Sequence, residues 1–138
     1  MSEFSKKELY YLLNRPGPLW LVQIDLSGAH LFGANLFESN LFGADLHGAN
    51  LEKTNLRAAN LSKVNLEGAI LIEANLEGAT LIDTKLTNAD LTNANLTGAN
   101  LTGVDLTGAI YTKATIWPQG IDLKFEGTIL KKEVTPFR

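Results

Sequence analysis

A leucine stands at every fifth position from Leu26 to Leu106, seventeen times without a break. This spacing suits neither regular element. In an α-helix, at about 100° per residue, successive leucines would cover all sides, and in a flat strand they would alternate between the two faces. They share one interior only if the chain turns once per repeat, so that each five-residue unit forms one side of a coil. Such units cannot bury an apolar face alone and must stack on one another.

The residues around each leucine support a coil. The residue two before the leucine is Ala in eleven of the seventeen repeats and small or β-branched in the rest, which predicts a second inward position. The residue two after it is Gly in nine repeats and Asn in two, and both accept the positive φ that a type II turn requires. We therefore expect a corner after each leucine. A different turn is expected at the remaining corners, which carry Glu38, Lys53, Ala58, Lys63, Glu73 and Asp83.

Repeats such as Ala44-Asp45-Leu46-His47-Gly48 and Ala94-Asn95-Leu96-Thr97-Gly98 resemble the A(D/N)LXX signature of pentapeptide-repeat proteins. The resemblance implies an all-β fold, a right-handed quadrilateral β-helix with about 20 residues per coil. The number of sides is taken from the resemblance, because a five-residue spacing does not determine how many sides a coil has. In the four-sided coil, one face would stack Asn35, Asn55, Asn75 and Asn95, whose side chains can bond nearby backbone or form ladders.

The chain is predicted to be one domain of three parts. Its 138 residues, 45% of them hydrophobic, suffice for a continuous core. Residues 1–20 form an N-terminal helical cap, because Ser5-Lys6-Lys7-Glu8 fits a capping box. We expect the apolar side of this helix to lie over the open end of the leucine column, and it carries Leu9, Tyr10, Leu12 and Leu13. The chain then enters the first coil through Leu19, Leu21 and Ile24.

Residues 21–116 are the predicted β-helix, and residues 117–138 are a C-terminal cap and tail. Tyr111 and Ile116 are expected to keep the inward slot at the end of the repeat. The segment from Trp117 to Asp122 is similar to tails that follow the repeats in cyanobacterial members of the family. Four later apolar residues are expected to fold back over the second end: Leu123, Phe125, Ile129 and Leu130.

Little in the sequence points to catalysis. There is no cysteine, hence no disulfide and no thiolate metal site. The two histidines, His30 and His47, fall on different faces of the predicted coil, so a metal site built from them is a minor alternative. No catalytic triad, zinc spacing or P-loop is present. We expect a protein that is not an enzyme and needs no cofactor.

The sequence also favours a cytoplasmic protein. No apolar run approaches the roughly 18 residues of a membrane span, and the N-terminus lacks a signal-peptide core. A membrane-surface or partner-binding role for the N-terminal helix is a minor alternative to capping, because that helix is short and weakly basic.

Residues 21–110 are acidic, with ten acids against four bases, and the whole chain has a net charge of −3. An acidic rod repels nucleic acid, so no direct DNA or RNA binding is expected. The resemblance adds another possibility, because some pentapeptide-repeat proteins inhibit DNA gyrase by mimicking duplex DNA. The gyrase-inhibiting members are longer, dimeric rods, whereas the rod expected here is short. The alternative is a solvated acidic surface, which a spread of charge over all faces would favour.

Folding explains one feature least, the three phenylalanines that follow consecutive leucines: Phe32, Phe37 and Phe42. We call them the aromatic band. They should point outward from three sides of the first coil, where exposed aromatics often mark an interaction site. Three further apolar residues lie on the same faces: Ile70, Ile72 and Ile82. Farther along, the slot after leucine is Thr six times running, from Thr87 to Thr112, which strand propensity explains.

The sequence thus predicts a scaffold whose outer faces bind an unidentified protein. The scaffold is expected to be a monomer or to self-associate weakly. A topoisomerase regulator that mimics DNA is the alternative. For the aromatic band, the competing explanation is that such residues merely suit strands and are partly sheltered by the N-terminal segment.

Overall fold

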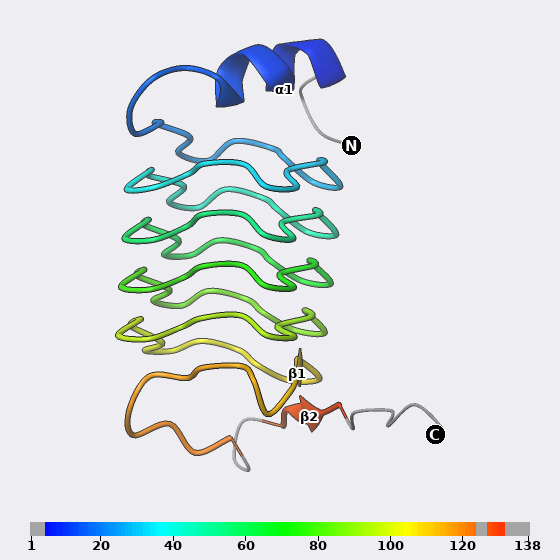
Figure 1. Cartoon of the computed structure of the whole chain (residues 1–138), viewed down its shortest axis with the longest axis vertical. Helices are drawn as coiled ribbons and strands as arrows, with labels where there is room; N and C mark the ends of the chain where they lie inside the picture. Colours follow the sequence, from blue (N-terminus) through cyan, green and yellow to red (C-terminus); the bar gives the residue numbers. More distant parts are fainter. Residues whose placement is uncertain (1–4, 124–126, 132–138) are drawn as a thin grey trace, which may run out of the picture.

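A computed structural model describes residues 5–123 and 127–131 of the chain. The chain winds as a stack of four-sided coils (Figure 1), in which residues 20 positions apart pair in parallel, such as Asn35 with Asn55 and Asn55 with Asn75. This confirms the prediction of four sides and 20 residues per coil. Most pairings join single residues. The described elements are therefore one helix, α1 (Lys6–Leu13), and two short strands, β1 (Ile110–Tyr111) and β2 (Ile129–Leu130).

The leucines form the interior, as predicted. Sixteen of the seventeen are at most 1% exposed, and Leu101, near the C-terminal end, is half-buried. The same backbone bonds recur between coils: Leu36 N–H donates to Asn55 C=O at 2.8 Å, and Asn55 N–H donates to Ala34 C=O at 2.9 Å. Because every side repeats this pattern, the backbone is nearly independent of the outward side chains.

The six corners expected to differ have the same turn as the others. Glu38, Lys53, Ala58, Lys63, Glu73 and Asp83 all adopt φ between +55° and +58°, close to the glycines at neighbouring corners. Each turn is closed by the same bond to the preceding leucine, for example Ala59 N–H to Leu56 C=O at 3.0 Å. The expectation of a second turn type was wrong, because stacking imposes one corner geometry even on residues that adopt it at a cost.

Helix α1 lies across the N-terminal end of the coil (Figure 1), as predicted. Its capping box is formed, since Glu8 N–H donates to Ser5 Oγ and Ser5 N–H donates to Glu8 Oε2 at 2.8 Å. Leu9 is buried, and Leu12 and Leu13 are half-buried against the core. The placement of Tyr10 on this packing side was wrong, because its side chain is 64% exposed.

The C-terminal end differs from the prediction at Ile116. Asn95 pairs with Ile116 across 21 residues, so the last repeat is one residue longer. Ile116 is therefore turned outward and 52% exposed. Trp117 packs against the core instead and contacts the Tyr111 ring edge to face at 5.6 Å between centroids.

Strand β2 pairs in parallel with β1 at this end. Its residues, Ile129 and Leu130, are 54% and 46% exposed. They extend one face of the coil. The prediction that they fold back over its end and become buried was wrong. Leu123 is half-buried, and Phe125 lies outside the described residues.

Candidate functional site

We name the four faces of the coil after Phe32, Phe37, Phe42 and His47. The pairing of residues 20 apart places Ile70 and Ile72 on the Phe32 face and Ile82 on the Phe42 face. The aromatic band therefore runs around three sides of one coil. The three isoleucines lie farther toward the C-terminal end on two of those sides.

The six candidate residues differ in exposure. The Phe32 side chain is 58% exposed and Ile70 is 37% exposed, whereas Phe37, Phe42, Ile72 and Ile82 are half-buried. Phe32 is thus the member of the aromatic band with the most apolar surface in water. Scattered single apolar residues are ordinary on a protein surface, but a contiguous band with an exposed ring is less so.

Each phenylalanine of the band has a cation over its ring, supplied by the next coil. Lys53 Nζ lies 5.8 Å from the Phe32 centroid, Arg57 Cζ 5.9 Å from that of Phe37, and Lys63 Nζ 5.9 Å from that of Phe42. Two of the cations also approach acids one coil farther along: Lys53 reaches Glu73 at 3.9 Å and Arg57 reaches Glu77 at 3.8 Å. Each ring of the band is therefore partly covered by a cation, and for Phe32 and Phe37 that cation also approaches an acid; these contacts were not predicted from the sequence.

A groove of about 620 Å³ separates α1 from the first coil. Leu9, Tyr10 and Leu13 line its helix side, and Ala29, Phe32 and Ala34 line its coil side. The N-terminal segment thus borders Phe32, as expected, without covering it. Three further exposed aromatics at this end were missed: Tyr10, Tyr11 and Trp20, the last 79% exposed. The adjacency of Tyr10 and Tyr11 could have signalled this, since neighbouring helical residues point in different directions.

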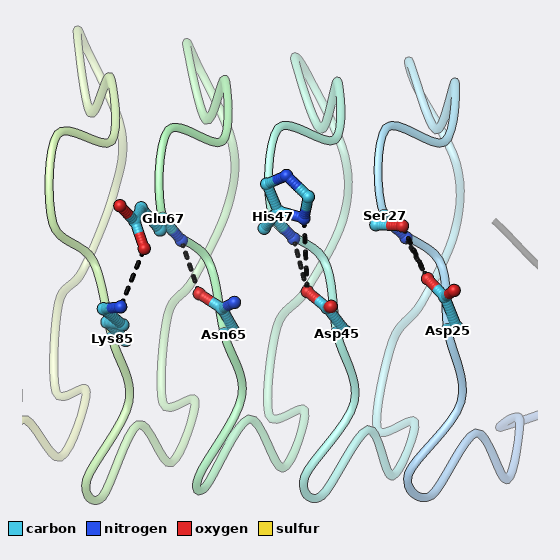
Figure 2. A network of polar contacts seen from close by, with 7 residues as sticks. All are labelled: Asp25, Ser27, Asp45, His47, Asn65, Glu67 and Lys85. Carbon is cyan, nitrogen blue, oxygen red and sulfur yellow. Dashed lines mark hydrogen bonds and ion pairs between the residues drawn. The ribbon is translucent and has the colours of Figure 1, made fainter. Parts of the chain in front are cut away.

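The His47 face carries a polar network rather than a row of free carboxylates (Figure 2). Ser27 Oγ donates to Asp25 at 2.6 Å, His47 Nδ1 lies 3.7 Å from Asp45, and Lys85 Nζ lies 2.7 Å from Glu67. The bond from Ser27 lowers the pKa of the Asp25 carboxyl. The bond from Lys85 lowers the pKa of Glu67, and the same contact raises the pKa of Lys85.

Asx residues before the leucines bond the chain two positions on, as predicted. In Figure 2 the amide of Glu67 donates to Asn65 Oδ1 at 3.1 Å. Along the predicted stack of asparagines, one side-chain bond joins two of the amides, since Asn55 Nδ2 donates to Asn35 Oδ1 at 3.2 Å. The structure thus gives this repeated polar slot a role in the fold.

Charge is spread around the rod. Assigning each corner to the face before it, the ten acids of residues 21–110 fall four on the His47 face, three on the Phe32 face, two on the Phe37 face and one on the Phe42 face. The four bases fall one on each face. The net charges are therefore −3, −2, −1 and 0, so acids occur on every face but are concentrated on the adjacent His47 and Phe32 faces.

The two histidines lie on different faces, as predicted, His30 on the Phe32 face and His47 on its own. Within residues 5–123 and 127–131, no cluster of three or more His, Cys, Asp or Glu side chains is placed to hold a metal ion. No helix in these ranges is long and apolar enough to cross a membrane.

A family model described as pentapeptide repeats matches the chain in eight copies, over residues 20–48, 39–78 and 74–110. A search of curated proteins finds no match. Among solved structures, a pentapeptide repeat protein from Nostoc PCC 7120, alr5209, is similar at 32% identity, covering 92% of this chain and 96% of its own, with a TM-score of 0.41.

Two further structures are similar. Rfr23 from the cyanobacterium Cyanothece 51142 shares 38% identity over 75% of this chain and 67% of its own, with a TM-score of 0.37. QnrB1, a plasmid-mediated fluoroquinolone resistance protein, shares 23% identity over 83% and 64%, with a TM-score of 0.51. The last likeness bears on the fold alone. Together with the repeat match, it supports the right-handed quadrilateral β-helix.

Proposed function

The chain belongs to the pentapeptide-repeat family, and from that premise we propose that it is a non-catalytic scaffold that binds another protein through its aromatic band. The observation that carries this proposal is the exposure of Phe32 at the mouth of the groove, in a band that folding does not require. In the fourteen other repeats the same outward slot holds Thr, Ser or Glu ten times, and the remaining four residues are His47, Arg57, Ile72 and Ile82. Large aromatics placed where small polar residues suffice are typical of binding surfaces.

The cations over the rings support a binding role. An ordered ring loses little side-chain entropy when a partner covers it, and such preorganisation raises affinity. Lys53, Arg57 and Lys63 lie over the three rings and would restrict their movement before a partner binds. Ile70, Ile72 and Ile82 would extend the contact along two faces.

The DNA-mimicking alternative relies on acids, and the acids are shared among four faces that each carry a cation. The resistance protein that resembles this chain is related at 23% identity, which bears on the fold and not on activity. We therefore favour the apolar contact. The cytoplasm remains the proposed location.

The experiment is a pull-down at low and high salt with three forms of the protein: wild type, the triple variant Phe32→Ser, Phe37→Ser, Phe42→Ser, and a matched control, Thr92→Ser, Thr97→Ser, Thr102→Ser. The control residues occupy the same outward slot on the same three faces, three coils away. Circular dichroism checks that all three forms are folded.

We expect one partner to survive high salt with wild type and control and to be lost with the phenylalanine variant, because apolar contacts are insensitive to ionic strength. A partner lost at high salt but retained by the phenylalanine variant would refute the proposal and point to the acidic faces.

A further inference from the structure

The first coil has an open backbone edge on the Phe32 face. On every later coil of this face, the residue before the leucine donates its N–H to the coil above, as Asn50 does to Ala29 C=O at 2.9 Å. His30 has no coil above it, and neither has Asn35 at the next corner. Across the described ranges, the N–H groups of His30 and Asn35 find no acceptor, and the C=O groups of His30 and Phe32 find no donor.

The groove beneath α1 lies along this edge, since His30, Phe32 and Asn35 all line it. Its floor and walls are largely apolar, with Leu9, Leu13 and Ala34 among them. An edge with unpaired donors and acceptors beside an apolar groove can receive another chain that follows the same course, which satisfies both kinds of group at once. A small anion could use the N–H groups but would leave the C=O groups unpaired.

The charge of the groove specifies the occupant further. Lys6 lines it, and no acid does so. Lys7 and Arg15 stand nearby in the sequence, and the one acid among residues 5–20, Glu8, is bonded to Ser5. A segment carrying a carboxylate is therefore electrostatically complementary to the helix side of the groove.

We propose that the groove binds a short, acidic peptide of a partner protein, which adds as one more repeat above residues 30–35 and turns at its fourth and fifth residues, as the coil does at Phe32 and Gly33. The proposal rests on the scaffold function and names the element that the partner delivers. The register follows from the coil below, because residues 29–34 make four bonds with Asn50, Glu52 and Asn55. Repeating those bonds, the first and sixth peptide residues accept from His30 and Asn35 N–H. The third and fifth donate to His30 and Phe32 C=O.

The probe is a fluorescent capped hexapeptide, Val-Asp-Leu-Thr-Gly-Ala, the sequence of residues 104–109. Its leucine faces the apolar wall and its aspartate supplies the charge. A peptide N-methylated at the third residue loses one predicted bond, whereas N-methylation at the second residue leaves all four intact. Binding is followed by anisotropy, and exchange of the His30 and Asn35 amides by NMR.

We expect saturable binding that protects both amides from exchange. Methylation at the third residue should weaken binding on the order of tenfold and methylation at the second by less than about twofold. Lys6→Glu should weaken it about fivefold, and Lys7→Glu, the same change outside the groove lining, much less. The two methylated peptides are compared on the unaltered protein, so a misfolded protein cannot explain a difference between them.

No binding up to about 1 mM peptide would overturn the inference. So would equal binding of the two methylated peptides, or unchanged exchange at His30 and Asn35, because either result would mean that the groove takes an apolar side chain without backbone pairing. Thr102→Ser lies outside both the groove lining and the aromatic band and should not alter peptide binding. The pull-down and the peptide assay are independent. The pull-down can fail while the groove still binds the peptide, and the pull-down can succeed while the groove binds no peptide.

Discussion

The first coil and the threonine-rich coils near the C-terminal end share one backbone and differ on their outer surface. In the first coil, Phe32, Phe37 and Phe42 occupy the slot after the leucine and rely on cations from the next coil. Sixty residues farther along, threonine fills the same slot, and its hydroxyl bonds a side chain two residues away. Thr97 Oγ1, for example, donates to Asn95 Oδ1 at 2.6 Å. The threonines complete the fold's own hydrogen bonds, whereas the phenylalanines leave apolar surface uncovered. Because both regions form the same backbone bonds, folding does not explain the aromatic residues of the first coil, and we interpret them as recognition residues.

The interior should show no such difference. Leu36 and Leu96 lie on the same face, in the first and the late coils, and both are 0% exposed. Leu36→Ala and Leu96→Ala should each lower the free energy of unfolding by about 2–5 kcal/mol, because each leaves a cavity. Urea unfolding measures both. A cost near zero at Leu36 would mean that the first coil is loosely packed, which would break the comparison.

Substitutions at the corners should have smaller effects on stability than those in the interior. Ala58 and Gly98 lie on one corner column, with φ of +57° and +67°. A Cβ at Gly98 would have nothing within 4 Å, so its effect there is conformational. Ala58→Gly should stabilise the protein by about 1 kcal/mol and Gly98→Ala should destabilise it by about as much. Thermal unfolding of both variants measures this, and shifts of the same sign would contradict it.

The stack of Phe37 and Arg57 should have a measurable coupling. A double-mutant cycle with Phe37→Leu and Arg57→Gln should give about 0.5–1 kcal/mol of interaction energy, the usual range for an exposed cation over an aromatic ring. The cycle is measured by urea unfolding. As a control, a cycle between Thr97 and Glu77 should give a smaller value. Equal couplings would show that the ring is not held by the cation.

The Glu67–Lys85 ion pair should produce the smallest effect. Bonding to Lys85 holds the pKa of Glu67 below its ordinary value of 4.5, so its contribution to stability is present above that value and is lost as the pH falls through the lowered pKa. Glu67→Gln should therefore be less stable than wild type at neutral pH, and the difference should narrow below pH 4.5. Thermal unfolding at several pH values tests this. Glu52→Gln serves as the control, since Glu52 forms no ion pair among the described residues.

The sequence predicted the coil because the period of five admits few other ways to bury every leucine. It failed where one residue shifts the register, as at Ile116, because an irregular step after Leu106 cannot be recognised from the leucine spacing. The corner residues were misjudged because local propensity was weighed without the stacking that overrides it.

The aromatic band and its outward position were predicted from the sequence, and the difference in exposure between Phe32 and the half-buried Phe37 and Phe42 was not. The cations over the rings stand 20 or 21 residues farther along, so the coil length would have identified them had it been applied to the outward slots. The groove depends on where α1 settles on the first coil, which the pattern of Leu9, Leu12 and Leu13 leaves undetermined. The unpaired edge at His30 follows from that position as well.

The account depends on the first coil being the recognition surface. Its most direct test places a photo-crosslinking phenylalanine derivative singly at positions 32, 37, 42, 92, 97 and 102 and irradiates each protein in lysate at high salt. We predict that a common crosslinked partner forms from the first three positions and not from the last three. Adducts of equal yield from both sets, or from the threonine positions alone, would contradict the account.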